Sequence, residues 1–488
     1  MSNYMTRRAW LAAAAAPLGF GQANKRNVLF IAVDDLRPEL GCYGNRVVKT
    51  PNIDRLARRG VVFTRAYCQQ AVCTPSRTSF LSGLRPDSTK VYENIKDIPF
   101  AEKLPNALTL PHHFRKNGYE TRAYGKIFGE GFNDAQAWSQ PLWPAGIAGM
   151  EYVDLKKWRA NPQARPIPTL EWEKAESIQA LEVPDDAYQD GRVADRAVAA
   201  LREMRGKPFF LAAGFLKPHL PFAAPKKYFD LYPLESIPMP ANPDPPKDAP
   251  PVALHDSVEL RGYTDIGKRP ITPEKTRELI RAYYACTTYT DTQIGKMLDE
   301  LDRQGLTANT TVVLLGDHGW HLGEHSLWAK TTNFELDTRA PLIMAGAGVK
   351  ARGQQAAGLV EFVDLYPTLC DVCGLAAPSH LEGHSMKPLL EKPRQQWKPA
   401  VFSQFPRPYR GKNPIQGMGY SVRTERYRYT EWRMDKASEN AVELYDHASD
   451  PRETVNIAAR PESQAIVERM RETLRSGWRA ALPPQSRK

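Results

Sequence analysis

Three carboxylates in the sequence follow apolar segments in a pattern that suits metal binding. Asp34 and Asp35 end one such segment, and Asp317 follows another, with His318 directly after it. Neighbouring carboxylates repel one another unless a cation lies between them. An oxygen-rich set favours Ca²⁺ or Mg²⁺, whereas a histidine is a softer ligand. Asp34 and Asp35 alone would fit a turn or a helix cap equally well. Together with Asp317 and His318 they predict a divalent metal site.

A cysteine and an arginine share the first turns of a predicted helix. In Cys73-Thr74-Pro75-Ser76-Arg77, the proline is typical of an opening helical turn, and Gly83 ends the segment. A helix N-terminus presents free N–H groups to an anion, and Arg77, four residues after Cys73, adds a cation on the same side. The pattern predicts an anion site beside a potential nucleophile, but a single cysteine at a helix start is also a common packing residue.

Two further apolar segments end in basic residues. Residues 119–124 lead into Lys126, and residues 209–215 lead into Lys217 and His219. In an open α/β sheet, ligands bind outside the carboxyl ends of the strands. We therefore expect these two basic endings and the two acidic ones to converge on one site.

The elements that would position these residues alternate between short, β-rich apolar segments and helical patterns. This alternation is typical of an α/β fold with a large, mostly parallel sheet flanked by helices on both faces. One long helix is predicted between an N-cap at Thr272 and a stop at Gly305. From about residue 396, short aromatic-rich segments predict a small antiparallel sheet, which a terminal helix would cover.

The length of 488 residues exceeds what a single hydrophobic core organises, so we expect more than one domain. Residues 1–23 read as the charged, apolar and small-residue regions of a secretory signal peptide, and Arg7-Arg8 resembles the twin-arginine type. A buried N-terminal helix is the alternative interpretation. Residues 24–395 would form a large domain and residues 396–488 a C-terminal α+β subdomain. We expect no membrane span in the mature chain, because no interior segment reaches ~18 apolar residues.

The charge balance and the cysteines narrow the class of protein further. Sixty-six Lys and Arg against 55 Asp and Glu give a net charge of +11, which suits an anionic partner. The basic residues are dispersed, and no compact basic run interleaves with aromatics, so we expect no nucleic-acid binding. Six cysteines are too few for a disulfide scaffold. We interpret Cys370 and Cys373 as packing residues of an amphipathic helix that ends at Gly374.

One motif resembles the signature of the type I sulfatases: Cys73-x-Pro75-x-Arg77, extended through Thr78-Ser79-Phe80-Leu81-Ser82-Gly83. The resemblance runs from Asn27 into the C-terminal domain and includes Val33-Asp34-Asp35, Gly125-Lys126, Lys217-Pro218-His219 and Glu443-Leu444-Tyr445-Asp446. Within the family, the chain is most similar to the iduronate-2-sulfatase branch. This similarity lies in the run from Asp317 through Trp328-Ala329-Lys330 to Asn333-Phe334.

The resemblance implies an alkaline-phosphatase-like fold, with residues 24–395 as the catalytic sulfatase domain. It implies that a formylglycine-generating enzyme oxidises Cys73 to Cα-formylglycine. It also implies one Ca²⁺, held by position 73 and by the residues that match the family's metal ligands, Asp34, Asp35, Asp317 and His318.

The resemblance implies roles for the basic residues as well. The hydrated aldehyde at position 73 would attack sulfur while the sulfate oxygens rest against Ca²⁺, Arg77, Lys126 and Lys330. His219 would protonate the departing alcohol, a role for a group that titrates near neutrality. Trp320 would either line a sugar subsite or pack in the interior.

The sequence departs from the sulfatase pattern at one position. Sulfatases usually carry a histidine shortly after the residue that matches Lys126, whereas this chain reads Lys126-Ile127-Phe128-Gly129. The missing histidine would help to deprotonate the nucleophile. Lys126 itself or His321 from another loop could take its place. Otherwise His321 satisfies hydrogen bonds within its own loop.

We therefore expect a bacterial sulfuric ester hydrolase, periplasmic or secreted, that acts on a sulfated carbohydrate such as a 2-O-sulfated uronate. Two alternatives stay open. One is a phosphoester or phosphonate hydrolase of the same superfamily, which the single apparent metal set disfavours. The other is an inactive sulfatase homologue that binds anions with Cys73 unconverted.

Overall fold

The structure is a computed structural model that describes residues 25–94, 100–129, 132–143, 175–409 and 414–484. The predicted signal peptide therefore lies outside the described residues. Among the described helices, none combines the length and the apolar character that crossing a membrane would need.

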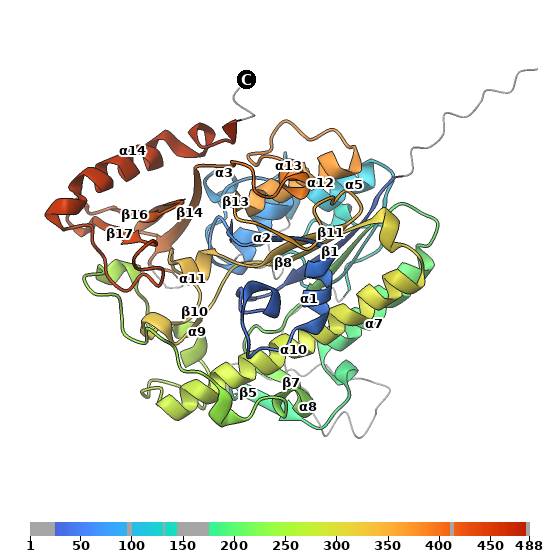
Figure 1. Cartoon of the computed structure of the whole chain (residues 1–488), viewed down its shortest axis with the longest axis horizontal. Coiled ribbons are helices and arrows are strands. Elements are labelled where there is room, and N and C mark those ends of the chain that lie inside the picture. Colours follow the sequence, from blue (N-terminus) through green and yellow to red (C-terminus); the bar gives the residue numbers. More distant parts are fainter. Residues whose placement is uncertain (1–24, 95–99, 130–131, 144–174, 410–413, 485–488) are drawn as a thin grey trace, which may run out of the picture.

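A seven-stranded sheet forms the centre of the molecule (Figure 1). Its strands, in spatial order, are β12 (Gln354–Ala356), β2 (Gly60–Phe63), β11 (Leu342–Gly346), β8 (Thr310–Gly316), β1 (Asn27–Val33), β6 (Phe209–Phe215) and β4 (Glu120–Gly125). Every neighbouring pair is parallel except the two pairs that contain β11. The prediction of a large, mostly parallel sheet is thus confirmed, with one reversed strand inside it.

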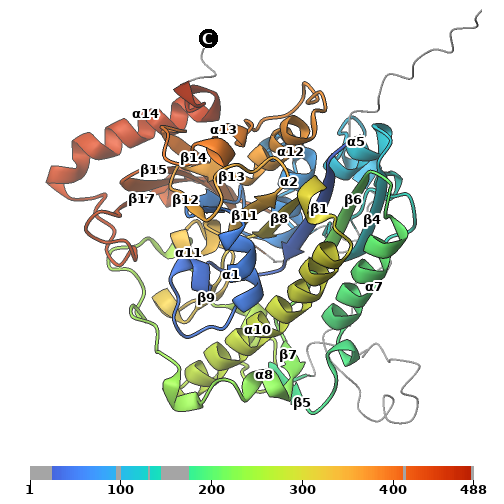
Figure 2. The same cartoon turned by 45° about the vertical axis from the view of Figure 1, so that its right-hand side comes forward.

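Helices cover both faces of this sheet, because its central strands are apolar on both sides. One layer consists of α2 (Cys73–Ser82), α5 (Leu110–Lys116) and α12 (Leu365–Cys373), which pack against side chains such as Phe30. The opposite layer consists of α1 (Pro51–Arg58), α7 (Gln189–Glu203) and α10 (Pro273–Arg303), which pack against side chains such as Ile31 (Figure 2). The predicted long helix is confirmed as α10, and its N-cap Thr272 accepts a hydrogen bond from the backbone N–H of Lys275.

A second, four-stranded antiparallel sheet follows in the chain. It consists of β14 (Ala400–Arg407), β15 (Gly417–Thr424), β16 (Tyr427–Met434) and β17 (Ala441–Asp446). The terminal helix α14 (Gln464–Ala480) covers it and buries Val467 and Met470 against Val422 and Tyr429 (Figure 1). The predicted C-terminal sheet and helix are therefore confirmed. The domain boundary at residue 396 stays a prediction.

Short elements complete the fold. The strands are β3 (Ala66–Tyr67), β5 (Ile178–Leu181), β7 (Phe222–Pro225), β9 (His321–Leu322), β10 (Trp328–Ala329) and β13 (Val360–Glu361). The helices are α3 (Pro86–Thr89), α4 (Phe100–Lys103), α8 (Lys226–Phe229), α9 (Val258–Arg261), α11 (Glu335–Thr338) and α13 (Lys387–Glu391).

All six cysteines are free thiols. Cys370 and Cys373 lie in α12, which ends at Gly374 in a left-handed conformation with φ of 70°. Burial raises the pKa of both thiols to about 12, so both are neutral and unreactive near neutral pH. This environment agrees with a packing role.

Candidate functional site

Four strand endings meet at one edge of the central sheet. Asp34 and Asp35 follow β1, Asp317 and His318 follow β8, Lys126 follows β4, and His219 lies in the segment after β6. These strands are neighbours in the sheet, and all four run in the same direction. The backbone N–H of Asp35 donates to Oδ1 of Asp317 at 3.0 Å, which joins the two acidic endings directly. The predicted residues therefore lie together in space.

Three carboxylates and one imidazole form the acidic part of the site. Asp34, Asp35, Asp317 and His318 are all fully buried. Nε2 of His318 lies 3.4 Å from Oδ1 of Asp35 and 3.7 Å from Oδ1 of Asp317. Burial raises the pKa of Asp35 and would raise that of Asp34, but nearby cations hold the pKa of Asp34 well below its usual value. So much buried negative charge needs strong cationic compensation.

Arg77 supplies part of that compensation from the second turn of α2. Its Nε donates to Oδ2 of Asp317 at 2.8 Å, and its second terminal nitrogen donates to Oδ1 of Asp34 at 3.1 Å. The remaining terminal nitrogen donates to the carbonyl oxygens of Lys126 and Ile127. Every residue of α2 is buried. The close packing of this helix and the hydrogen bonds of Arg77 together hold the guanidinium in one position.

Cys73 is the first residue of α2 and lies at the centre of these groups. Its Sγ is 3.5 Å from Nε2 of His318. It also lies within 4.8 Å of a ligand atom of Asp34, of Asp35 and of His219. Burial raises the pKa of the thiol to about 12, so an unmodified Cys73 stays protonated and is a weak nucleophile.

Two lysines reach the carboxylates from different loops. Nζ of Lys126 donates to Oδ2 of Asp34 at 2.5 Å, and Nζ of Lys330 donates to both carboxylate oxygens of Asp35 at 3.0 Å. The Lys330 ammonium lies 4.8 Å from the ring centroid of Trp320. Trp320 has no exposed surface, which matches the packing interpretation and gives no support for a sugar subsite at this ring.

His219 pairs with a carboxylate that the sequence did not reveal. Its Nε2 lies 3.1 Å from Oε1 of Glu259 and 3.8 Å from Oδ2 of Asp35, and Glu259 also accepts from Nζ of Lys330 at 2.7 Å. Burial would lower the pKa of His219, but the charge of Asp35 raises it above the usual value. Glu259 comes from α9, within a loop whose sequence carries no motif, so no signal could have found it.

The position of the missing histidine is sterically closed. A Cβ at Gly129 would lie 2.2 Å from Oγ1 of Thr74, so the backbone at this point has no room for a side chain. His321 does not fill the gap, because its Nδ1 contacts Asp337 at 2.6 Å and its Nε2 contacts His325 at 3.3 Å. His321 thus satisfies hydrogen bonds in its own region.

The donor set fits a hard divalent cation. Three buried carboxylates supply oxygen ligands, and His318 and position 73 lie close enough to complete a shell. A second acidic group in the described part of the chain, Glu335 with His447 and Glu453, is neutralised by Arg428 at 2.6 and 2.8 Å from the two glutamates. The first group has three carboxylates and the second only two, so the first offers a hard cation more oxygen ligands.

Comparison with known families shows to which family the chain belongs. The sulfatase family matches residues 26–375. The chain belongs to the sulfatase family. A second family, described as the C-terminal part of N-sulphoglucosamine sulphohydrolase, matches residues 323–479 of this sulfatase. It is a sulfuric ester hydrolase of the iduronate-2-sulfatase-like branch.

Individual relatives of the sulfatase cover nearly the whole chain. Iduronate 2-sulfatase of Mus musculus is 34% identical over 92% of this chain and 93% of its own, and that of Homo sapiens is 35% identical over 88% and 90%. A solved structure described as a 2-O GAG sulfatase is 26% identical with a TM-score of 0.70, and covers 93% of this chain and 91% of its own.

A phosphonate monoester hydrolase of Agrobacterium radiobacter is 24% identical with a TM-score of 0.77 over 94% of this chain and 96% of its own, which shows a shared fold. These likenesses confirm the predicted alkaline-phosphatase-like fold.

Proposed function

We propose that this sulfatase removes sulfate from a sulfated carbohydrate, with a 2-O-sulfated uronate as the substrate class. The observation that carries the proposal is the grouping of Arg77, Lys126, Lys330 and the His219–Glu259 pair around Cys73. Relatives named iduronate 2-sulfatase and a solved 2-O GAG sulfatase support the choice of sugar.

In this proposal, Asp34, Asp35, Asp317 and His318 hold one Ca²⁺ together with position 73. When bound, the ion supplies positive charge that polarises the sulfate oxygens. Position 73, once oxidised to formylglycine by a formylglycine-generating enzyme, supplies the hydrated aldehyde as the nucleophile. The raised pKa of the Cys73 thiol supports the need for such a modification.

The basic residues then bind and orient the sulfate group. Lys126 contacts Asp34 and Lys330 contacts Asp35, and Arg77 is fixed between Asp34 and Asp317. Their charges would lie where negative charge develops on the transferred group, and all three side chains are buried. The lysines would exchange part of their contact with the carboxylates for contact with sulfate oxygens.

His219 is suited to protonate the leaving alcohol. Its Nδ1 contacts the carbonyl oxygen of Leu220, which can only accept, so Nδ1 carries a proton. Its Nε2 faces Glu259 and Asp35, which favour a second proton there. The resulting imidazolium is the acid form, and the leaving oxygen would replace Glu259 as the acceptor of the Nε2 proton. Glu259 acts as a positioning residue.

Neither of the two substitutes proposed for the missing histidine has the features of a base. His321 is bonded to Asp337 and His325. Burial would lower the pKa of Lys126, but the charge of Asp34 raises it above the usual value and keeps the amine cationic. We therefore propose that Lys126 stabilises charge. A Lys126→Ala enzyme that turns over normally would exclude this role.

The test is sulfate release by protein co-produced with a formylglycine-generating enzyme. Mass spectrometry should show formylglycine at position 73, and Cys73→Ala should abolish release of sulfate from defined sugars sulfated at different positions. Cys286→Ala, which removes another buried thiol, in α10, should keep activity. Full activity with unmodified Cys73, or faster turnover of matched phosphate or phosphonate esters, would overturn the proposal.

We also propose that the protein is exported from a bacterial cell to the periplasm or beyond. The signal-like sequence of residues 1–23 supports this location. Loss of export in an Arg7→Lys, Arg8→Lys variant, measured by cell fractionation, would support the twin-arginine route. Unchanged export of this variant would contradict it.

A further inference from the structure

A pocket of about 210 Å³ opens directly beside the sulfate site. It is lined by residues 254–259, 328–331 and 407–409. Two of its lining residues, Glu259 and Lys330, also belong to the site around Cys73. A sugar whose sulfate lies against Lys330 would therefore extend into this pocket.

His255 offers a hydrogen-bond donor in this pocket wall that no described residue uses. The backbone N–H of Ser257 donates to its Nδ1 at 2.9 Å, so Nδ1 is unprotonated and the ring proton is on Nε2. Burial lowers the pKa of His255 to about 4, which keeps the ring neutral. Nε2 is buried and has no hydrogen-bond partner among the described residues. Buried donors are normally satisfied, so an acceptor from a ligand is expected here.

Arg407 brings a buried positive charge to the same pocket. Its three guanidinium nitrogens donate to the carbonyl oxygens of Val252, Pro406 and Ala253 at 2.9, 3.1 and 3.3 Å. Its side chain forms no ion pair with any carboxylate among the described residues, and only 8% of the residue is exposed.

The lack of an ion pair is unusual for a buried guanidinium, whose neighbours are the rings of Phe405 and Trp432 at 5.0 and 5.2 Å. Burial lowers the pKa of Arg407 to about 10, and the nearest acidic influence, Glu443, accepts hydrogen bonds from Trp432 and Tyr445 instead. A buried and unpaired cation is unfavourable unless an anion joins it, and a guanidinium has five N–H groups of which only part is used here.

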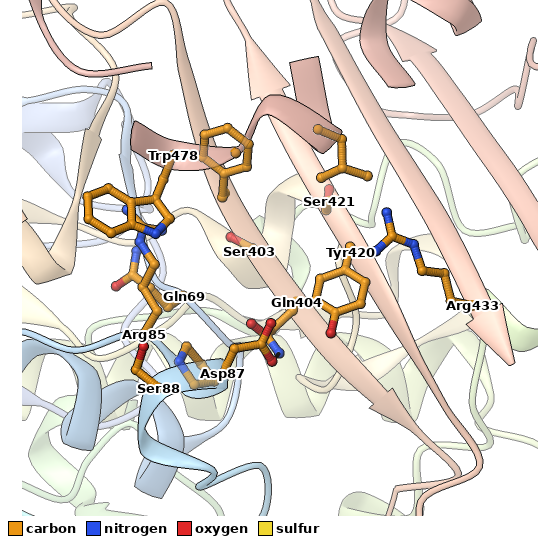
Figure 3. A pocket seen from close by; sticks show the side chains of 14 residues that line it. Gln69, Arg85, Asp87, Ser88, Ser403, Gln404, Tyr420, Ser421, Arg433 and Trp478 are labelled. Atoms are coloured by element: carbon orange, nitrogen blue, oxygen red, sulfur yellow. Dashed lines mark hydrogen bonds between the residues drawn. The ribbon is translucent and has the colours of Figure 1, made fainter. Parts of the chain in front are cut away.

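A larger pocket elsewhere in the molecule has no unpaired arginine in its lining. It has a volume of about 270 Å³ and lies between α3, the second sheet and α14 (Figure 3). Its two arginines are already paired, Arg85 with Glu361 at 2.8 Å and Arg433 with Glu431 at 2.9 Å. An unsatisfied donor beside an unpaired cation thus favours the pocket at His255 as the anion site.

We propose that His255 and Arg407 form a second anion subsite, which binds the carboxylate of the uronate whose sulfate is hydrolysed at Cys73. This inference rests on the proposed function. In a uronate ring, the 2-O-sulfate and the carboxylate project from opposite sides, so recognition of both requires two cationic positions separated by the sugar. The pocket shares Lys330 with the sulfate site and places Arg407 beyond it.

The test compares two substrates that differ only in this group, a 2-O-sulfated uronate glycoside and its analogue with the carboxylate reduced to an alcohol. Wild-type enzyme should prefer the carboxylate substrate by roughly 10- to 100-fold in kcat/KM, since hydrogen bonds to a charged group are stronger than those that the alcohol can form. His255→Ala and Arg407→Gln should lose most of this preference through a higher KM for the uronate, with kcat/KM for the reduced analogue nearly unchanged.

Arg433→Gln removes the same charge from the pocket of Figure 3 and should keep the wild-type ratio. Arg407 also supports the backbone at residues 252–253, so His255→Ala keeps the test decisive if Arg407→Gln does not fold. Equal turnover of both substrates by wild-type enzyme, or an equal loss on both in His255→Ala, would overturn the inference.

Nitrophenyl sulfate has no carboxylate, so its turnover distinguishes a failure of the proposed subsite from a failure of the proposed function. Sulfate release from this ester together with indifference to the carboxylate overturns the subsite alone. A converted enzyme that releases sulfate from none of the esters overturns the proposed function as well. A reduced analogue that regains turnover when it carries a second sulfate in place of the carboxylate would assign the subsite to sulfate and overturn its assignment to carboxylate.

Discussion

Oε1 of Glu259 lies 3.1 Å from Nε2 of His219. The same oxygen accepts a hydrogen bond from Lys330 at 2.7 Å. One carboxylate therefore joins His219, the proposed acid for the leaving alcohol, to Lys330, a proposed ligand of the sulfate. Because Glu259 stands in α9, between residues 238–251 and α10, the position of α9 controls the orientation of the imidazole.

The first prediction concerns the leaving group. His219→Ala should lower kcat on a sulfated sugar by roughly 10² to 10⁴, because an alkoxide needs a proton to depart. The loss on nitrophenyl sulfate should be far smaller, since nitrophenolate leaves without help. Glu259→Gln should also lower kcat more on the sulfated sugar than on nitrophenyl sulfate, but by a smaller factor than His219→Ala. Steady-state kinetics on both substrates measure it, and an equal loss of kcat on both would contradict the proton-donor role.

The second prediction concerns removal of the metal. Chelation should abolish sulfate release, and Ca²⁺ should restore it better than Mg²⁺, because the buried site offers several oxygen ligands. The melting temperature should also fall, since an ion present at about 100 times its Kd stabilises the folded state by about 2.7 kcal/mol. Asp317→Asn should remove most of the Ca²⁺-dependent rise in Tm. Activity and Tm that are indifferent to chelators would exclude a metal at this site.

The third prediction concerns the close contact between Gly129 and Thr74. Gly129→Ala should destabilise the protein by about 1–3 kcal/mol, because the added Cβ meets Oγ1 of Thr74 at 2.2 Å and overpacks the site. Thr74→Ala in the same chain should recover part of the loss. Denaturant unfolding of both single variants and the double variant measures the coupling. Additive effects would show that the two positions do not touch.

The fourth prediction links acid stability to Glu335. Burial would raise the pKa of Glu335, but Arg423 and Arg428 hold it well below its usual value. A carboxyl with a depressed folded-state pKa stabilises the protein above its unfolded pKa of about 4.3, and this contribution is lost as the pH falls. Glu335→Gln should therefore destabilise by about 3 kcal/mol at neutral pH and by less at acidic pH.

Thermal unfolding across pH measures this effect. Glu391→Gln, which removes one partner of the surface pair with Lys350 at 2.9 Å, is the control and should leave the unfolding temperature unchanged. A Glu335→Gln deficit that does not shrink at low pH would argue that the lost stability comes from packing and not from charge.

Much of the site could be predicted because its residues stand at the carboxyl ends of parallel strands. Asp34, Asp317 and Lys126 each directly follow an apolar segment, so their sequence positions alone place them at one sheet edge. The motif that begins at Cys73 also predicted that this residue stands at the N-terminus of a helix. The reversed direction of β11 was not predicted, since a largely buried strand has the same apolar sequence pattern in either direction.

The remaining residues of the site depend on contacts between distant loops. Glu259, His255 and Arg407 follow no strand ending of the central sheet, and their roles arise from which partners they meet or lack in space. The lack of room for a side chain at Gly129 likewise comes from its contact with Thr74, which lies in α2. Composition and spacing carry no information on such contacts, so only the folded structure reveals them.

The burial of Cys73 sets an order of events. Only 4% of Cys73 is exposed, and all ten residues of α2 are buried between the central sheet and the elements around it. An enzyme that oxidised this cysteine would need access to its side chain, which the native state does not offer. The proposed modification would therefore have to come before α2 packs, during or soon after synthesis. If the chain is exported already folded, the oxidising enzyme must work in the cytoplasm.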